Sequence, residues 1–502
     1  MSMNQPSLLT GGLNPPQSQQ YTRYIPSAFD DSLSMLEKLN KMVVYLNQIG
    51  ELSNDVLDQW NNVSAWVMND GLNLAVSQKI ASMLTDGSLP TSIIAGISNL
   101  ATLIATIQAN QVVDEANISK LQNVKYFGTP EDYGAKGDGV TDDTSAIQQC
   151  FTNNIVSMFQ PKSYLISGTL TVPKNHSIQG NHAQLTIGGS FTANTIGSNV
   201  PVKTVLYITP RDPVWLAELD MKGSFVKDLR IRGNANLNLT GMFLGVPDRT
   251  AVTQGTAVNY SVWGYSFENI ILSYCMDGLV LSEVWNCTFN QIATSHMTGN
   301  GCAIQGQAVN NTFTGCSFST STEGSYGVYV NSGVYNGNTW RPEGNMFMGG
   351  FIGEANNGIR IQSCLSLKFI GCIIDLSTNN AFLGYDCSDV TVSGCYLSSS
   401  GVTTVTLADL TAVSGSYVNF TDCNIVPNGG THAFSIGAYQ TGVSIKGCML
   451  TQDITFWSYA KGNVLHNVWN QGDTVTSLII AQPNATINKA NNMFKGTGTA
   501  VN

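Results

Sequence analysis

The sequence VKYFGTPEDYGAKGDGVTDDTSAIQQC, residues 124–150, decides the fold that we expect for this 502-residue chain. Three glycines, Gly134, Gly137 and Gly139, lie close together in it, and such spacing favours a compact turn over a helix or a strand. The TDDT sequence at 141–144 then supplies oxygens that can accept hydrogen bonds from the free N–H groups of a starting helix. Apolar residues follow at helical spacing over 146–151, which predicts one short amphipathic helix.

The sequence patterns before and after this stretch suggest a structural role for the helix. The sequence before it has a helical pattern, and the sequence after it has the pattern of many short strands. A short amphipathic helix at such a boundary can cover the open end of a stack of strands, whose core would otherwise be exposed. Asp138, Asp142 and Asp143 are expected to be turn and cap residues, because neither the spacing of a calcium loop nor a phosphate-binding Gly-Lys-Ser/Thr sequence accompanies them.

Three segments together resemble the opening of one known fold. These are DYGAKGDGVTDDTSAIQ at 132–148, FQPKSYLISGTLTVP at 159–173 and SIQG at 177–180. They are similar to the start of pectate-lyase-like right-handed β-helices, an opening that bacteriophage tailspikes and appendage proteins commonly carry. The resemblance implies a mainly β protein, a right-handed parallel β-helix preceded by an α-helical or coiled-coil N-terminal region.

The repeat pattern after residue 225 points to the same fold independently. Apolar trios recur with one spacing, and from residue 270 their central residues are 22, 24, 34, 22, 23, 28 and 25 residues apart. Short alternating strands with a period in this range indicate a solenoid. A glycine or another turn-forming residue usually precedes the central residue, which predicts a tight bend between two inward-pointing side chains. The trios begin at Val226, Phe267, Phe289, Phe313, Phe347, Phe369, Val392, Phe420 and Ile445.

The repeat also gives a role to the cysteines. Five of the eleven share the central position of the trio, so we expect them to stack inside the solenoid as small apolar residues: Cys316, Cys372, Cys395, Cys423 and Cys448. A disulfide framework is disfavoured by the odd number of cysteines and by their shared phase. No Cys-x-x-Cys pair is present and the five histidines are scattered, so the sequence predicts no metal and no cofactor.

Composition excludes two classes of partner. The formal net charge is −10 with only 23 Lys and Arg, so nucleic acid is not an expected partner. Residues 89–113 carry no charge over a length that would span a bilayer, but many Ser, Thr, Asn and Gln interrupt them, so no membrane insertion is expected. The overall field would not steer a strongly anionic polymer either, although a local basic pocket could still hold one.

Four regions are predicted along the chain. They are an extended virion-attachment arm (1–31), a helical or coiled-coil docking and trimerisation region (32–123), the right-handed β-helix (124–450), and a C-terminal capping or trimer region (451–502).

The N-terminal regions suggest how the chain assembles. Ile and Leu recur at alternating steps of four and three over 93–121, which favours a coiled coil of three strands and hence a homotrimer. An intramolecular helical hairpin is the alternative. Residues 21–49 resemble the virion-docking N-termini of phage appendage proteins, which implies phage tail or neck proteins as partners.

Binding residues are expected where the solenoid carries its longest insertion, because loops are free to vary while rungs are constrained by packing. The 34-residue step holds the segment 319–344, and 248–265 is a second candidate. Aromatic faces among short polar groups suit sugar rings, which need stacking and hydrogen bonds. Packing of the loops themselves, or of a trimer interface, is the alternative. The predicted substrate-binding residues are Tyr335, Trp340, Arg341, Tyr260 and Trp263.

Candidate catalytic residues follow from the repeat register. Glycoside cleavage generally needs two carboxylates, and Glu354 and Asp375 fall at similar positions of consecutive rungs, about 4.8 Å apart in such a stack. Both could instead be solvated turn residues. Glu323 and Glu343 in the insertion are the further candidates.

The resemblance implies a phage tailspike or appendage protein, made in the host cytoplasm and carried on the virion tail. Its implied function is to bind a bacterial surface polysaccharide or wall teichoic acid and to depolymerise it by hydrolysis or elimination. A non-catalytic receptor-binding protein is the first alternative. A cellular pectin-degrading enzyme is the second, and it is disfavoured by the helical N-terminal part, by an N-terminus without the pattern of a secretion signal, and by the absence of the Asn-Thr-Asp and Gly-His-Gly motifs of polygalacturonases.

Overall fold

The computed structural model describes residues 125–192, 203–210, 223–246, 261–321, 325–335, 338–408, 417–470 and 479–495, with residues 82, 85, 87, 102, 105, 106 and 108. The chain divides into two compact units, residues 1–118 and 119–502. The predicted arm at 1–31 and most of the predicted trimer seam at 93–121 lie outside the described residues. None of the described helices is both long enough and apolar enough to cross a membrane.

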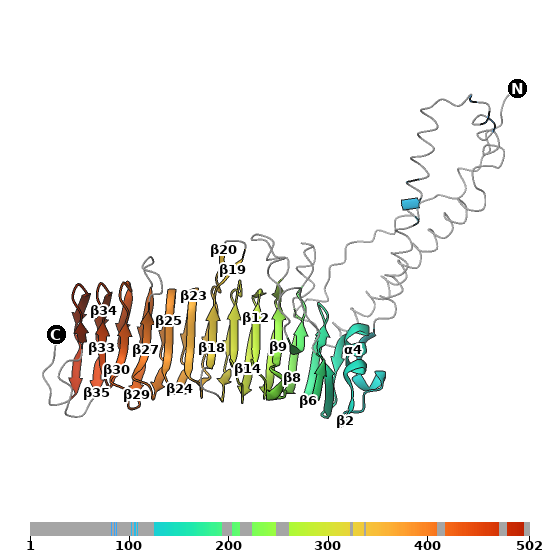
Figure 1. The fold of residues 1–502 in the computed structure, drawn as a ribbon, viewed down its shortest axis with the longest axis horizontal. Coiled ribbons are helices and arrows are strands. Elements are labelled where there is room, and N and C mark those ends of the chain that lie inside the picture. Colours follow the sequence, from blue (N-terminus) through green and yellow to red (C-terminus); the bar gives the residue numbers. More distant parts are fainter. Residues whose placement is uncertain are drawn as a thin grey trace, which may run out of the picture. The chain divides into compact units, whose positions relative to one another are not determined.

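The second unit is a parallel β-helix, so the β-helix part of the predicted fold is confirmed (Figure 1). Each turn of the chain, or rung, contributes one strand to each of three columns, and every strand pairs in parallel with the equivalent strand of the next rung. The strands of column 1 are β5 (Leu170–Val172), β7 (Thr204–Ile208), β9 (Thr240–Gly245), β12 (Leu279–Ser282), β15 (Cys302–Gln305), β18 (Tyr326–Asn331), β27 (Thr403–Ala408), β30 (His432–Ile436), β33 (Asp453–Phe456) and β36 (Ile479–Ala481).

Column 2 follows column 1 along the chain. Its strands are β1 (Lys125–Gly128), β3 (Asn154–Met158), β16 (Thr312–Thr314), β21 (Met346–Met348), β28 (Val418–Thr421), β31 (Val443–Lys446), β34 (Lys461–Leu465) and β37 (Thr486–Ala490). Column 3 follows column 2 along the chain. Its strands are β2 (Asp138–Asp142), β4 (Ser163–Gly168), β17 (Ser317–Ser319), β22 (Phe351–Gly353), β24 (Ile373–Ser377), β26 (Tyr396–Ser399), β29 (Asn424–Pro427), β32 (Met449–Leu450), β35 (Val468–Asn470) and β38 (Met493–Lys495).

Several longer strands run through two columns. The strands β6 (Ser177–Thr192), β8 (Phe225–Arg232), β11 (Ser266–Ser273) and β14 (Thr288–Ser295) join columns 2 and 3, whereas β23 (Asn357–Ile370) and β25 (Asn380–Ser393) join columns 1 and 2. Two short pairs lie outside the columns: β10 (Val262–Trp263) with β13 (Val284–Trp285), and the hairpin of β19 (Gly333–Tyr335) and β20 (Asn338–Trp340).

The predicted bend between columns 2 and 3 is a single residue in the left-handed region. It is Asn269 on one rung and Gly315, Gly371, Gly394 and Gly447 on others, with φ from 51° to 67°. Glycine adopts this conformation without the steric cost that a Cβ atom brings, which explains the Gly-Cys pairs that the sequence repeats. The side chains on either side of the bend, such as Phe313 and Cys316, point into the core, as the trio pattern predicted.

The core consists of ladders of like side chains. Phe267, Phe289, Phe313, Phe347 and Phe369 stack on five rungs, with ring centroids 4.3–4.9 Å apart. All eleven cysteines are buried and none forms a disulfide, so the predicted stack of thiols is confirmed. The sulfur of Cys316 lies 3.4 Å from the carbonyl oxygen of Phe289 one rung earlier, so each thiol of the stack can donate a weak hydrogen bond.

The N-terminal end of the stack carries the predicted helix, α4 (Thr144–Asn153), beside the 3-10 helix η2 (Pro130–Tyr133) (Figure 1). Ile147 and Phe151 of α4 lie in the buried core, as expected for a capping helix. Asp138 accepts the N–H groups of Val140 and Thr141, so this aspartate is a turn residue. Asp143 likewise accepts the N–H groups of Lys136 and Gly137.

The strand stack continues beyond the boundary that the sequence suggested at residue 450. Six further strands, β33 to β38, extend the three columns as far as Lys495. The trio pattern fades because Asn467 replaces the stacked cysteine and accepts the N–H of Cys448 at 2.8 Å. Asn467 in turn donates through its main-chain N–H to Asn492 at 2.9 Å. An amide ladder thus replaces the thiol stack without ending the fold.

Candidate functional site

The end of column 3, where the chain turns towards column 1, holds the two carboxylates that the sequence singled out: Glu354 follows β22 and Asp375 lies in β24. Gly353 pairs with Asp375, and the N–H of Glu354 donates to the main-chain oxygen of Asp375 at 3.3 Å, so the two acids lie on consecutive rungs. Glu354 is exposed and Asp375 is half-buried. Gly353 places no side chain beside Asp375, and a Cβ atom there would lie 1.7 Å from the Asp375 carbonyl oxygen.

The geometry of this turn also offers a structural role for both acids. Glu354 has a φ of 48°, a conformation that is uncommon for a residue with a Cβ atom. Oδ1 of Asp375 accepts the N–H of the next residue, Leu376, at 2.7 Å, so one oxygen of this carboxylate is engaged with the main chain. Among the described residues, the other oxygen of Asp375 and the carboxylate of Glu354 have no hydrogen-bond partner.

The long insertion lies at a different turn from the two carboxylates. The hairpin β19–β20 and the residues after it connect column 1 to column 2 (Figure 1). In this insertion Trp340 is buried, whereas Arg341 and Glu343 are exposed. Glu354 and Asp375 lie at the other end of the column 1 strands. The sequence therefore predicted two neighbouring acids and one insertion, and the structure separates them by the length of a strand.

A second pair of predicted residues shares the turn from column 1 to column 2. Trp263 pairs with Trp285, which pairs with Val309, and Val309 pairs with Glu343. Trp263 and Glu343 therefore lie on one line, three rungs apart. Tyr260 and Glu323 lie outside the described residues, as does the side chain of Tyr335.

Sequence reasoning missed three residues that lie on the turn of the carboxylates. The guanidinium of Arg232 lies 5.1 Å from the centre of the Tyr274 ring, and the rings of Tyr274 and His296 stack at 4.6 Å and 16°. Each of the three contributes an exposed side chain from a successive rung. Thr294 pairs with Phe318 on the next rung, and Ser319 pairs with Gly353 on the rung after that. Because His296 lies two residues after Thr294 and Glu354 lies one residue after Gly353, both occupy the same turn, and Glu354 is two rungs further along. We call Arg232, Tyr274 and His296 the turn stack.

The outward face of column 1 carries a second aromatic group. Tyr326, Tyr329, Arg360 and Tyr385 come from three successive rungs and are all half-buried. The rings of Tyr326 and Tyr329 lie 5.3 Å apart, and the Arg360 guanidinium is within 6 Å of three tyrosine rings. Tyr326 and Tyr329 lie in the segment 319–344 that the sequence singled out, but sequence reasoning could not place an arginine of another rung beside them.

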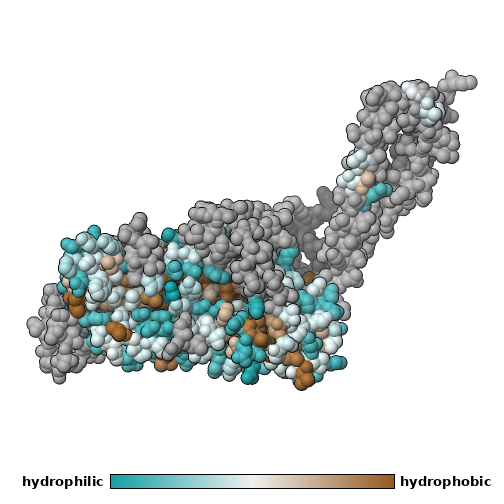
Figure 2. All heavy atoms as spheres, viewed as in Figure 1, coloured by the Kyte–Doolittle hydropathy of each residue, from teal (hydrophilic) through white to brown (hydrophobic). Residues whose placement is uncertain are grey.

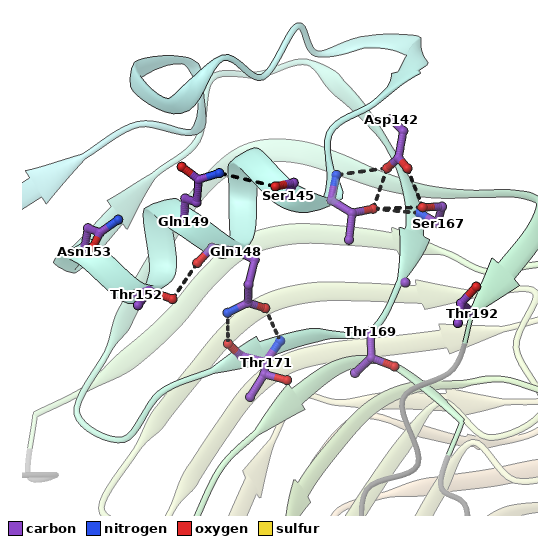
Figure 3. A pocket seen from close by; sticks show the side chains of 12 residues that line it. Asp142, Ser145, Gln148, Gln149, Thr152, Asn153, Ser167, Thr169, Thr171 and Thr192 are labelled. Atoms are coloured by element: carbon purple, nitrogen blue, oxygen red, sulfur yellow. Dashed lines mark hydrogen bonds between the residues drawn. The ribbon is translucent and has the colours of Figure 1, made fainter.

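A polar pocket of about 620 Å³ lies beside α4 (Figure 3). Its side chains largely satisfy one another: Gln148 exchanges two hydrogen bonds with the main chain of Thr171, and Asp142 accepts from Thr144 and Ser167. No aromatic or cationic residue lines this pocket. We therefore interpret it as the seam between the capping helix and the first rungs, without catalytic groups.

The polarity of the surface agrees with this division between a structural seam beside α4 and two surfaces that carry charged or aromatic side chains. Figure 2 shows hydrophilic residues over most of the visible strand stack, with apolar residues in separate small patches. The chemically distinctive surfaces of the described residues are therefore the turn with the two carboxylates and the aromatic face of column 1. Fold and site together define a parallel β-helix protein with paired carboxylates and stacked aromatic side chains.

Comparison with known proteins confirms the resemblance to phage appendage proteins. The chain is 30% identical over 207 residues to the pre-neck appendage protein of Bacillus phage B103, which covers 41% of this chain and 21% of that protein. It is 38% identical over 88 residues to depolymerase 1, capsule K30/K69-specific, of Klebsiella phage K5-2, covering 17% of this chain and 10% of that protein. The chain thus spans about a fifth or less of these relatives.

Two further comparisons complete this result. No family model matches the chain. Among solved structures, bacteriophage CBA120 tailspike protein 3 superposes with a TM-score of 0.43 at 12% identity, covering 75% of this chain and 60% of that one. Because that score is low, the assignment of the fold rests on the strand pairing itself.

Proposed function

We propose that this chain is part of a phage tail appendage that binds a bacterial surface glycan, capsule or wall teichoic acid, and depolymerises it. The observation that carries the proposal is the turn where Glu354 and Asp375 lie on consecutive rungs, in line with the turn stack. The similarity to a phage pre-neck appendage protein and to a capsule depolymerase supports the same function.

The chemistry assigned to the two acids is that of a general acid paired with a base or nucleophile. Carboxyl groups about 5–5.5 Å apart suit retention of configuration, and roughly 6.5–9.5 Å leaves room for a water molecule and suits inversion. Neighbouring strands lie about 4.8 Å apart, so acids from adjacent rungs can reach either separation by a change of rotamer.

The turn stack determines the direction in which a bound glycan would lie. Its aromatic rings succeed one another along the axis of the β-helix and end two rungs before Glu354. Sugar rings bind aromatic side chains by apolar contact and bind polar groups by hydrogen bonds to their hydroxyls. A polymer that lies along the axis would therefore contact the turn stack and the carboxylates together.

Assembly belongs to the same proposal. The N-terminal residues 1–123 would attach the protein to phage tail or neck proteins, and the Ile/Leu seam at 93–121 would hold three chains together. The test is the mass of the intact protein by light scattering. A trimer has three times the chain mass of 53.8 kDa, and a monomer would contradict this part of the proposal.

The decisive experiment separates cleavage from binding. Purified protein is incubated with capsular polysaccharides and wall teichoic acids from candidate hosts, and the products are sized. Glu354→Gln and Asp375→Asn should each lower turnover by about a hundredfold or more while binding persists. Glu268→Gln is the matched control, because Glu268 is a half-buried acid of column 2 that pairs with Lys227 at 2.9 Å. Unchanged turnover in both variants would remove the pair and direct the search to Glu323 and Glu343.

One observation favours a non-catalytic receptor-binding protein as the second candidate. The bond from the N–H of Leu376 to Oδ1 of Asp375 gives this acid a structural task in its turn. In that case the wild-type protein would bind a host polymer without shortening it, and Asp375→Asn would lower stability with no effect on any product.

A further inference from the structure

Arg360 occupies a position on the outward face of column 1 that the local sequence dictates. Its neighbours Ile359 and Ile361 are fully buried, and side chains alternate along a strand, so Arg360 points away from the core. The strand register sets Tyr329 directly beside it on the preceding rung and Leu383 on the following rung. The surrounding side chains therefore come from three different rungs.

Three tyrosines hold the guanidinium of Arg360. The centres of the Tyr326, Tyr329 and Tyr385 rings lie 5.1, 5.7 and 5.6 Å from its central carbon. Tyr326 and Tyr329 come from the rung before Arg360, and Tyr385 comes from the rung after it. Contacts of this kind stabilise the cation through the negative faces of the rings and leave the plane of the guanidinium to hydrogen bonds.

The N–H groups of Arg360 are not paired with an acid. One Nη donates to the hydroxyl of Tyr326, whereas Nε is buried and has no hydrogen-bond partner. The ion pairs of the described residues involve Lys162, Lys227 and His432, and none involves Arg360. A buried donor on a charged group without an acceptor is unfavourable, so a ligand that accepts hydrogen bonds from this guanidinium would stabilise the arrangement.

We infer that Arg360 binds an acidic group, a carboxylate or a phosphate, of the surface glycan, while Tyr329 and Tyr385 contact the adjoining sugar rings. A guanidinium binds such anions through two parallel N–H bonds, a geometry that lysine cannot reproduce. The inference rests on the proposed glycan binding and names the class of polymer, an acidic one.

One property of the surroundings supports an anion at this position, and one opposes it. Burial raises the pKa of Tyr329, so its hydroxyl stays protonated and remains a donor to the ligand. The protein carries a net charge of −10, so its overall field repels an acidic polymer. Recognition of an anion therefore depends on short-range contacts with an oriented donor, which Arg360 supplies.

The test compares three probes of matched length on the intact protein. Oligogalacturonate carries a carboxylate on each ring, poly(glycerol phosphate) carries phosphates, and dextran is neutral. We expect one acidic probe to bind the wild type at least tenfold more tightly than dextran, and the identity of that probe tells carboxylate from phosphate. Arg360→Gln should abolish the preference and Arg360→Lys should retain only part of it. Arg230→Gln, from column 3 and outside both surfaces, should leave the preference unchanged.

Thermal melting of each variant checks that the fold is retained, and Tyr329→Phe, which keeps the ring and removes only the hydroxyl, provides a milder variant of the same group. Equal affinity for all three probes, no measurable binding of either acidic probe, or a preference that survives in Arg360→Gln would overturn the inference. The proposed function is judged separately by cleavage of host polymers in the Glu354 and Asp375 variants. A protein that cleaves a host glycan but shows no preference for acids would retain its function and lose this inference.

Discussion

Gly353 and Asp375 are paired across consecutive rungs so closely that a Cβ atom at Gly353 would lie 1.7 Å from the carbonyl oxygen of Asp375. No side chain fits at that distance, so Gly353→Ala must push the two rungs apart. We expect it to lower the free energy of unfolding by about 3 kcal/mol, which a shift of the denaturation midpoint would measure. The displaced turn should also lower any turnover that depends on Glu354 and Asp375.

The control for this prediction is Gly189→Ala. Gly189 lies in β6, and a Cβ atom there would have nothing within 4 Å. The two substitutions add the same methyl group to a strand glycine. Equal stability of both variants would show that the rungs relax without cost and would refute the argument from the close contact.

Leu376 is strained at the same turn. It has a φ of 57°, in the left-handed region, and 58% of its surface is exposed. A residue with a Cβ atom in this conformation loses roughly 1–2 kcal/mol, and asparagine tolerates it better. Leu376→Asn should therefore raise the free energy of unfolding by about 1 kcal/mol. Leu365→Asn is the control, because Leu365 is also exposed but is not in the left-handed region; an equal gain there would assign the effect to lost surface hydrophobicity.

The cysteine stack predicts thiols that are free but unreactive. Burial raises the pKa of Cys316, a member of the stack, to about 11, and that of Cys275, which is buried outside the stack, to about 12, so neither forms the reactive thiolate at neutral pH. Native protein should react slowly or not at all with a thiol reagent, and denatured protein should react at all eleven cysteines. A disulfide found by mass spectrometry under non-reducing conditions would contradict the stack.

The repeated core could be predicted from sequence because each rung repeats it. Phe313, Phe347 and Phe369 each lie two residues before a glycine of the bend, and a solenoid places equal positions on one line. The adjacency of Glu354 and Asp375 followed from the same counting. The method failed where the residue type changed while the position was kept, as at Asn467, which continues the line of Cys448.

The candidate surfaces were only partly predictable. A 34-residue step reveals an insertion but does not tell which of the three turns of a rung carries it, so Glu343 appeared closer to Glu354 than it is. Tyr274 and His296 are single residues of ordinary turns, and only the strand register brings their rings together. Arg360 and Tyr385 meet for the same reason. Such sites depend on the length of every turn between them, which a pattern of apolar residues does not specify.

His176 gives a prediction about acid stability. It is buried near Phe151, its Nδ1 lies 2.9 Å from the carbonyl oxygen of Asn154, and its Nε2 has no hydrogen-bond partner. Nδ1 therefore carries the proton in the neutral ring. Burial lowers the pKa of His176 to about 4 from an ordinary 6.5, because protonation would add a charge and an unpaired N–H in the core.

The sign of the effect follows from the two pKa values. Above pH 6.5 the histidine is neutral in both states and contributes no pH dependence. As the pH falls from 6.5 towards 4, the unfolded chain binds a proton that the folded chain refuses, so stability falls, by about 3 kcal/mol in all. His176→Asn removes this group and can keep the hydrogen bond to Asn154.

Denaturant unfolding at pH 7.5, 6, 5 and 4.5 measures the effect as the difference between the wild type and His176→Asn. The comparison is needed because Asp142 and Asp228 have lowered pKa values, so they also cost stability in acid, and they do so equally in both proteins. The advantage of the wild type should shrink steadily below pH 6.5. A difference that stays constant over this range would mean that His176 becomes protonated in the folded state as readily as in the unfolded chain, and would contradict its burial as a neutral ring.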